Sequence, residues 1–106
     1  MSSSSFWHPT LERCGFILKD GTVVEVENTS ATPSSTFKIS EDEISNIGLE
    51  NICIFWHSHP SGNVNLSLDD YFAFLSFPDQ KHRIYNQTGF AEYYVRRGFV
   101  MREEEL

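Results

Sequence analysis

The sequence predicts an α/β domain of the α+β type, in which a curved mixed β-sheet carries one or two short helices. Short runs rich in β-branched and aromatic residues recur along the chain with turn residues between them, a pattern typical of strands. Two other segments begin with helix-capping residues instead. Because 106 residues is within the usual size of one domain, we expect a single domain over residues 1–106, with residues 1–10 as a flexible lead.

The first elements are a β-hairpin and a loop. Residues 14–19 and 22–27 are β-rich runs that flank the pair Asp20-Gly21. An Asp-Gly pair between two such runs is a strong signal for a two-residue hairpin turn. Residues 28–36 are rich in Ser, Thr and Pro, which predicts a loop.

A helix and a buried strand follow this loop. Ser40 and Glu43 have the spacing of a capping box, which predicts a helix that ends near Gly48. The next run, residues 52–56, is apolar and rich in β-branched and aromatic residues. It predicts a buried strand that leads directly into His57.

The last part of the chain predicts a second helix and three strands. The helix covers about residues 68–77 and stops at Pro78, which cannot continue it. Gly98 marks a turn between the last two strands. The expected strands cover residues 83–85, 91–97 and 99–102.

The transition from the buried strand to the second helix carries two imidazoles, a hydroxyl and a carboxylate: His57, His59, Ser67 and Asp70. Side chains alternate along a strand, so His57 and His59 lie on one face. Two neutral imidazoles followed by a carboxylate are the ligand set of a catalytic zinc ion, with a fourth position left for water. The sequence therefore predicts a Zn2+ site made by His57, His59 and Asp70.

Two other interpretations of these residues stay open. Ser67 also fits the N-cap of the second helix with Asp70 at the third helical position, and neither residue then needs to contact a metal. His57 and His59 can be solvated histidines on a surface strand, although the apolar run before them favours buried partners. A hydroxyl can cap a helix and donate elsewhere at the same time, so the capping and site roles are compatible.

The pattern His57-x-His59-Pro60, followed by Ser67 and Asp70, resembles the JAMM motif of the MPN-plus metalloprotease family, with each defining position filled at the family's spacing. In that family, an upstream glutamate before a Cys-Gly pair holds the zinc-bound water. Residues 11–18, with Glu12 shortly before Cys14-Gly15, are similar. The resemblance thus implies an MPN-like (cytidine-deaminase-like) fold and assigns this glutamate role to Glu12.

The resemblance implies a peptidase mechanism. Zinc lowers the pKa of its water from ~15.7 to about 7 and polarises the scissile carbonyl. Glu12 then takes the proton of the water and passes it to the leaving amine. Ser67 donates a hydrogen bond to the oxyanion, an interaction whose loss in other enzymes costs about 10²–10³ in rate.

Within the family, the chain looks most like the peptidase domain of the tail-assembly proteins of long-tailed phages. The features that carry this resemblance are the compact layout, the Glu-x-Cys-Gly motif before the first strand and the final segment, residues 93–100. This resemblance implies tail-tip or tail-assembly proteins as partners, among them a ubiquitin-like tail protein, and a peptide substrate. It places the chain in the host cytoplasm during assembly and in the virion tail afterwards. The open alternatives are a structural tail-tip subunit without turnover and a cellular prokaryotic JAMM peptidase that acts on ubiquitin-like or sulfur-carrier proteins.

The composition argues against two classes of function. The chain has 8 basic and 15 acidic residues and a formal net charge of -7, whereas nucleic-acid binders gain affinity from clustered Lys and Arg. Residues 1–5 lack the basic region and apolar core of a signal peptide, and no stretch is long enough to span a bilayer. We therefore expect no nucleic-acid role and no membrane span.

The two cysteines, Cys14 and Cys53, lie in apolar strand contexts, which predicts small core residues. A cysteine protease would pair one of them with His57 or His59, but no electropositive surroundings favour a thiolate.

Five other residues bear on the site. Trp56 should point to the face opposite the two histidines and belong to the core. His8 and His82 have no ligand spacing and are expected on the surface. Gly62-Asn63 either lets the loop approach an extended peptide or simply makes a turn.

Overall fold

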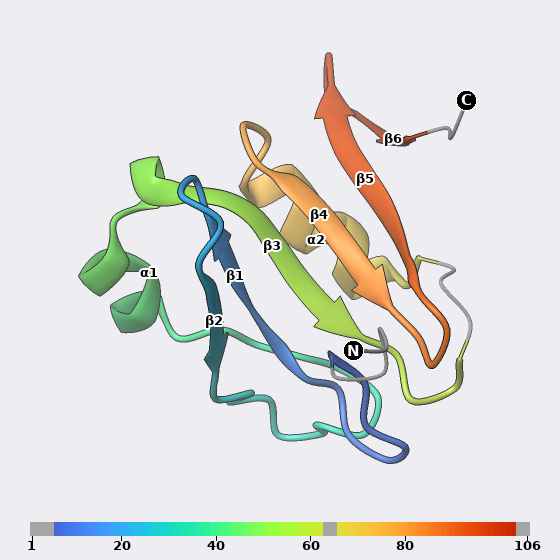
Figure 1. Cartoon of the computed structure of the whole chain (residues 1–106). Coiled ribbons are helices and arrows are strands. Elements are labelled where there is room, and N and C mark those ends of the chain that lie inside the picture. The colour runs from blue at the N-terminus through green and yellow to red at the C-terminus, as the bar shows by residue number, and fades with distance from the viewer. Residues whose placement is uncertain (1–5, 63–65, 104–106) are drawn as a thin grey trace.

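The computed structural model describes residues 6–62 and 66–103, which form a single α+β domain built on one open, mixed sheet (Figure 1). The strand order is β2-β1-β3-β4-β5-β6, with β3 and β4 parallel and the other neighbours antiparallel. The coarse fold class is therefore confirmed. The strands are β1 (Cys14–Leu18), β2 (Val23–Val26), β3 (Ile52–Ser58), β4 (Lys81–Tyr85), β5 (Phe90–Arg96) and β6 (Phe99–Arg102); the helices are α1 (Glu41–Ile47), the 3-10 turn η2 (Leu49–Asn51) and α2 (Leu68–Ser76).

Both expected hairpins form. The first turn has three residues, Lys19 to Gly21, rather than the expected two: the Gly21 N–H donates to the carbonyl of Leu18 and the Leu18 N–H donates to the carbonyl of Thr22, both at 2.9 Å. Gly21 has φ 91°, and the Thr22 N–H donates to Oδ1 of Asp20 at 2.9 Å. Between β5 and β6, Arg97 and Gly98 have φ 54° and 80°, the left-handed pair that a tight hairpin turn requires. Turn residues thus fix the pairing at both ends of the sheet.

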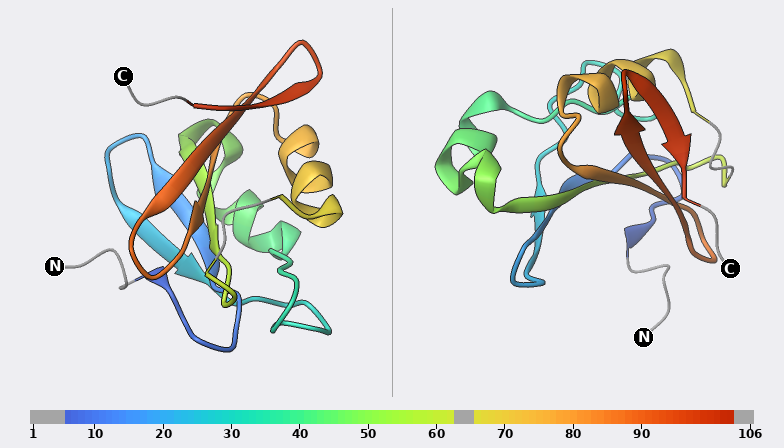
Figure 2. Two further views of the ribbon diagram at one scale, coloured as in Figure 1. Left: turned by 90° about the vertical axis from the view of Figure 1, so that its right-hand side faces the viewer. Right: turned by 90° about the horizontal axis from the view of Figure 1, so that it is seen from above.

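The parallel pair β3–β4 requires a crossover, and α2 provides it. The helix begins at the capping residue Ser67 and its last hydrogen-bonded turn ends at Phe77, directly before Pro78. The crossover carries α2 to the same side of the sheet as α1, as the view from above shows (Figure 2). We call this side the helical face and the other side the open face.

The core lies between the sheet and the helices, in two clusters. One cluster is centred on Cys14, Phe16, Ile52 and Phe55, with Ile44 and Ile47 of α1 packed against it. The other joins Phe74 of α2 to β4 and β5 through Ile84, Ala91 and Tyr93. His57 lies on this helical face, where its ring lies 6.3 Å from that of Phe74.

No α-helix of the described part of the chain covers the open face. Trp56 points to this face, as expected, and is 1% exposed because the rings of Phe6 and Tyr85 pack edge-on against it. Phe6 also stacks on Tyr85 at 4.3 Å between ring centroids. The part of the expected flexible lead that is described is therefore packed on the sheet; residues 1–5 lie outside the described residues.

Two placements expected from the sequence are wrong. Cys53 is exposed rather than in the core, because the β1–β3 register shifts there: Ile17 pairs with Ile54 and Leu18 with Ile52, which leaves Cys53 as the extra residue of a bulge. His82 is 2% exposed rather than on the surface. Its ring lies between the rings of Phe55 and Phe74, and its Nε2 donates to the carbonyl oxygen of Phe77 at 3.0 Å.

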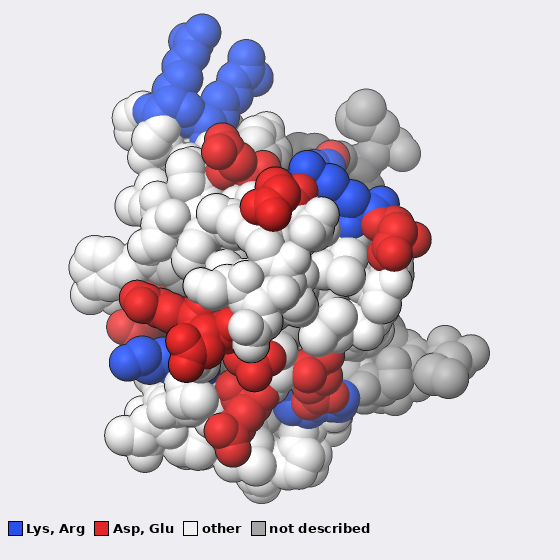
Figure 3. All heavy atoms as spheres, turned by 90° about the vertical axis from the view of Figure 1, so that its left-hand side faces the viewer, with Lys and Arg blue, Asp and Glu red and all other residues white. Residues whose placement is uncertain are grey.

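The charges are unevenly distributed over the surface. On the side that carries β2 and α1, carboxylates gather with a few Lys or Arg side chains among them, and long Lys or Arg side chains project at the top of this view (Figure 3). No helix in the described ranges is long and apolar enough to cross a bilayer.

Candidate metal centre

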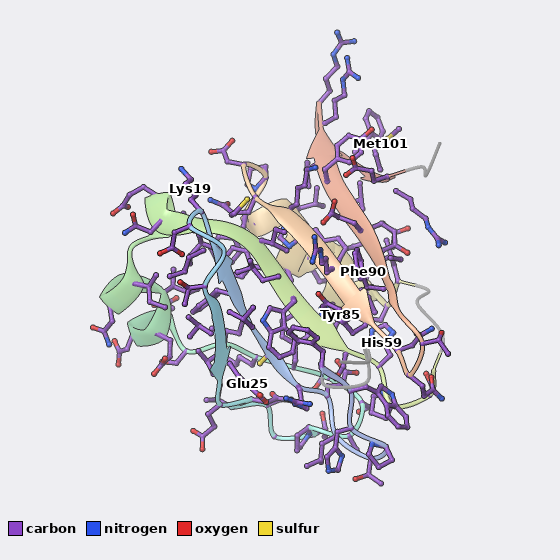
Figure 4. The ribbon with its side chains drawn as sticks, viewed as in Figure 1. Lys19, Glu25, His59, Tyr85, Phe90 and Met101 are labelled. Carbon is purple, nitrogen blue, oxygen red and sulfur yellow. The ribbon has the colours of Figure 1, made fainter. Side chains whose placement is uncertain are left out.

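The β1–β3 pairing places Glu12 beside His59. Cys14 is opposite His57 in the antiparallel register, and the Ser58 N–H continues the ladder by donating to the carbonyl of Arg13 at 2.9 Å. Glu12 lies two residues before Cys14, and His59 lies two residues after His57, so both fall on the helical face. Figure 4 shows His59 just beyond the end of β3, near Tyr85 at the end of β4.

Three described residues bring ligand atoms within 4.8 Å of one another: Glu12, His57 and His59. All three are buried. A carboxylate and two imidazoles are donors that divalent transition metals prefer, and this group could hold a metal ion.

Asp70 approaches the same group from α2. Its Oδ1 lies 2.9 Å from Nε2 of His57, and its Oδ2 lies 3.3 Å from Nε2 of His59. The two Nε2 atoms are 3.2 Å apart. The sequence-predicted set His57, His59 and Asp70 is therefore brought together, with Glu12 adjoining it.

These separations fit a tetrahedral ion. Metal–ligand bonds of about 2.0–2.1 Å at tetrahedral angles place neighbouring ligand atoms about 3.3 Å apart. The observed 2.9, 3.2 and 3.3 Å are close to this value, although the two imidazoles face different oxygens of Asp70. The donor set and its spacing thus fit a tetrahedrally coordinated divalent metal ion.

Ser67 fixes the carboxylate of Asp70. The Asp70 N–H donates to Oγ of Ser67 at 3.2 Å, and the Ser67 N–H donates to Oδ2 of Asp70 at 3.0 Å. This reciprocal pair is a capping box at the start of α2. The capping role expected for Ser67 is confirmed, and the same contacts aim Asp70 at the imidazoles.

The electrostatics of the site favour a cation and a proton acceptor. Burial raises the pKa of Glu12 from 4.5 to about 7, because it disfavours the ionised carboxylate. Burial also acts to raise the pKa of Asp70, but hydrogen bonds from His57 and His59 outweigh it and hold that pKa well below its usual range. Burial lowers the pKa of His57, so its ring stays neutral, as a metal ligand must be.

Several residues that the sequence did not single out support the site. Asn28 donates from Nδ2 to the carbonyl of Glu12 at 2.8 Å, and Phe37 stacks on the ring of His57 with 4.1 Å between centroids. Trp7 donates from Nε1 to the carbonyl of His59 at 2.9 Å. Asn28 and Phe37 come from the segment between β2 and α1, whose composition signals only a loop.

A cavity of about 370 Å³ opens beside Glu12 and His59. Hydroxyl groups surround it: Ser34, Ser35, Ser61 and Ser67. Gly62 has φ 86°, and its carbonyl accepts from Nδ2 of Asn86 at 2.9 Å, so it lies in a fixed turn. Its expected neighbour at the mouth, Asn63, lies outside the described residues.

The cysteine-protease alternative finds no support. Burial raises the pKa of Cys14 to about 12, so its thiol is protonated at neutral pH. Cys53 is exposed near the start of β3, whereas His57 and Ser58 lie at the end of that strand.

Comparison with known proteins shows the fold but not a family. No protein-family model matches the sequence, and no curated protein matches it. The solution structure of protein DSY2949 from Desulfitobacterium hafniense is similar, with a TM-score of 0.65 and 20% sequence identity over 97% of this chain and 81% of that chain. At that identity the likeness concerns the fold alone.

Proposed function

We propose that the chain is a zinc-dependent peptidase of the JAMM type with an MPN-like (cytidine-deaminase-like) fold. The observation that carries this proposal is the convergence of His57, His59 and Asp70 at 2.9–3.3 Å, with Glu12 beside them at the edge of an open cavity. The β1–β3 pairing and the capping box at the start of α2 produce this convergence.

Each residue has a role that its geometry supports. His57, His59 and Asp70 hold the zinc, which when bound acts as a Lewis acid on water and on the scissile carbonyl. Glu12, a buried carboxylate beside the two imidazoles, accepts a proton from the attacking water and returns it to the leaving amine. Ser67 accepts the Asp70 N–H through Oγ, and its own O–H can be donated to the oxygen of the substrate.

The substrate in this proposal is a flexible, extended peptide segment. The cavity beside Glu12 is open and lined by hydroxyl groups, which can pair with the backbone of an extended chain. The sequence resemblance alone supplies the biological setting, a tail protein co-encoded with this chain in a long-tailed phage. A ubiquitin-like tail protein is the partner it suggests.

A second candidate is a structural zinc site without turnover. Glu12 lies within 4.8 Å of the imidazole nitrogens, so its carboxylate can itself serve as a ligand. Four protein ligands close a zinc site, and closed sites are structural. The role of Glu12 therefore separates the two candidates.

The experiment compares Glu12→Gln with His59→Ala, each purified and analysed for zinc and for cleavage of the co-encoded tail proteins by mass spectrometry. The peptidase proposal expects Glu12→Gln to retain zinc and lose cleavage, and His59→Ala to lose both. Glu27→Gln, which changes an exposed glutamate directly after β2, is the matched control and should behave as wild type. Zinc loss in Glu12→Gln favours the structural site, whereas undiminished zinc in His59→Ala rejects both candidates.

A further inference from the structure

Helix α2 is apolar on the side that faces away from the core. Its inner side buries Phe74 and Asp70. Its outer side carries four large apolar residues that solvent reaches: Leu68, Tyr71, Phe72 and Leu75, with exposed fractions of 69, 43, 60 and 43%. We call these four residues the outer stripe.

The outer stripe has the spacing of a helix-packing surface. Its members lie at offsets of three, four and seven residues from Leu68, so they form one continuous band along the helix. A helix that is apolar on both sides is normally buried on both sides. The sheet covers the inner side, and no element of the described part of the chain covers the outer stripe.

An apolar cavity of about 360 Å³ lies between α1 and α2, at the flank of the outer stripe. Its lining includes Phe37, Ile44, Phe55, Ala73, Phe77 and His82. A cavity of this size is within the range of sites that hold a large side chain or a small ligand. A helix packed along the outer stripe could therefore insert one apolar anchor between α1 and α2, as in helix-in-groove recognition.

The charges around this surface identify the kind of partner. Neither α1 nor α2 contains Lys or Arg, and Lys38 is the cation on the cavity lining. The exposed charges on the two helices are all acidic: Glu41, Asp42, Glu43 and Asp69. The α1 side is accordingly rich in carboxylates (Figure 3).

A second copy of the chain does not suit this surface. It would bring two acidic clusters together in a protein of net charge -7. The outer stripe also exposes an area equal to about two whole side chains, whereas stable dimers bury about 800 Å² on each partner. A short, positively charged partner segment avoids both problems.

We propose that the outer stripe and the adjoining cavity are a docking surface for an amphipathic helix of another protein, with apolar residues along one side and Lys or Arg along its flanks. Leu68 directly follows Ser67, so the docked helix lies beside the candidate metal centre. The cavity lining also includes His57 of the candidate metal centre, whereas the four residues of the outer stripe belong neither to that centre nor to the cavity lining.

The test uses a synthetic amphipathic peptide of about 18 residues, long enough to form a helix, with Leu at offsets of three and four residues and Lys elsewhere. A second peptide has Glu in place of Lys. Binding to the full chain is measured by calorimetry and by amide chemical shifts. The Lys peptide should bind and shift α2 and the cavity lining, and Phe72→Ser/Leu75→Ser should weaken binding about tenfold or more.

The control variant is Phe99→Ser, which removes a large exposed apolar side chain from β6 and should bind as wild type. All variants should remain folded at the temperature of the binding measurement, as their amide spectra will show. Three results would overturn the proposal. They are binding of the Glu peptide as tight as that of the Lys peptide, unchanged binding of the Lys peptide by Phe72→Ser/Leu75→Ser, and amide shifts confined to the acidic β2 edge. Failure of the Lys peptide to bind would also overturn it if the outer stripe instead mediates another contact. That contact would be a dimer in sedimentation equilibrium, or attachment to phosphatidylcholine vesicles, and Phe72→Ser/Leu75→Ser would abolish it.

Discussion

Ser67 and Asp70 hold each other through two reciprocal hydrogen bonds, 3.0 and 3.2 Å long, at the first turn of α2. The Oδ2 atom that accepts from the Ser67 N–H is also the atom that lies 3.3 Å from Nε2 of His59. One carboxylate therefore caps the helix and faces the imidazoles. The two interpretations of this segment that the sequence left open are compatible in a single geometry.

Replacing Ser67 by alanine should weaken both the helix and the metal site. Loss of an N-cap hydroxyl costs about 1 kcal/mol in the free energy of unfolding. Loss of a contact that orients a ligand typically costs about 10–100-fold in metal affinity. Denaturant unfolding of the metal-free chain measures the first effect, and competition with a zinc-binding dye measures the second.

Ser67→Thr is the matched control for this experiment, because threonine retains a capping hydroxyl. It should remain near wild type in both measurements. If Ser67→Ala lowers stability but leaves zinc affinity unchanged, the cap does not orient Asp70 toward the ion.

Gly15→Ala should destabilise the sheet strongly. A Cβ atom at Gly15 would lie 2.0 Å from the carbonyl oxygen of Val24 and 2.9 Å from the Trp56 ring, and the backbone oxygen cannot move without separating β1 from β2. We expect a loss of about 3 kcal/mol, at the upper end for overpacking. Gly89→Ala has open space around its Cβ and should change stability by less than about 0.5 kcal/mol. Equal unfolding midpoints would refute this account of Gly15.

The sequence predicted those parts of the fold that local chemistry determines. Gly21 and Gly98 adopt the positive φ that glycine favours in turns, although the first turn has three residues rather than two, and Pro78 follows the end of α2. The packing of Phe6 on Tyr85 could not be predicted, because it joins residues far apart in the sequence. Composition near a chain terminus carries no signal for such a contact.

The same distinction applies to the site. The spacing of His57, His59 and Asp70 was visible in the sequence, and their convergence follows from strand alternation and the helix cap. His82 was misplaced, because a polar residue between charged neighbours gives no sign that two phenylalanine rings will enclose it. Phe37 and Asn28 were missed, because only the folded loop brings them to the site.

Zinc should stabilise the folded chain, since the ligand cluster exists only when β1, β3 and α2 are assembled. At a free concentration about a hundredfold above the dissociation constant, the gain is about 2.7 kcal/mol. For a domain of this size each kcal/mol raises the unfolding temperature by about 4–8 °C. Calorimetry with zinc and with excess chelator measures the difference at fixed protein concentration.

Magnesium is the matched control for zinc, because it prefers oxygen ligands over imidazole and should not raise the unfolding temperature. His59→Ala should show little gain with zinc. An equal gain in wild type and His59→Ala would place the stabilising ion elsewhere on the chain.

The burial of His82 should make stability depend on pH. Burial lowers the pKa of His82 from 6.5 to about 4, because the charged ring would lose its hydration between Phe55 and Phe74. Between these two values the unfolded chain binds a proton that the folded chain does not, so stability falls as the pH falls. Protonation of His82 costs no stability above about pH 6.5. By pH 4 it lowers the free energy of unfolding by about 3 kcal/mol.

His82→Phe isolates this contribution, because phenylalanine fills the same aromatic stack but does not titrate. At pH 7 the variant should be about 1 kcal/mol less stable than wild type, since it lacks the hydrogen bond from Nε2 to the Phe77 carbonyl. Near pH 4 the order should reverse, because only the wild type must keep an imidazole uncharged. Urea unfolding of both proteins with chelator present gives the free energy of unfolding of each from pH 7 to pH 4. In the difference between these two pH curves the titrations of the other groups cancel. Parallel curves would mean that His82 takes up its proton in the folded state without cost.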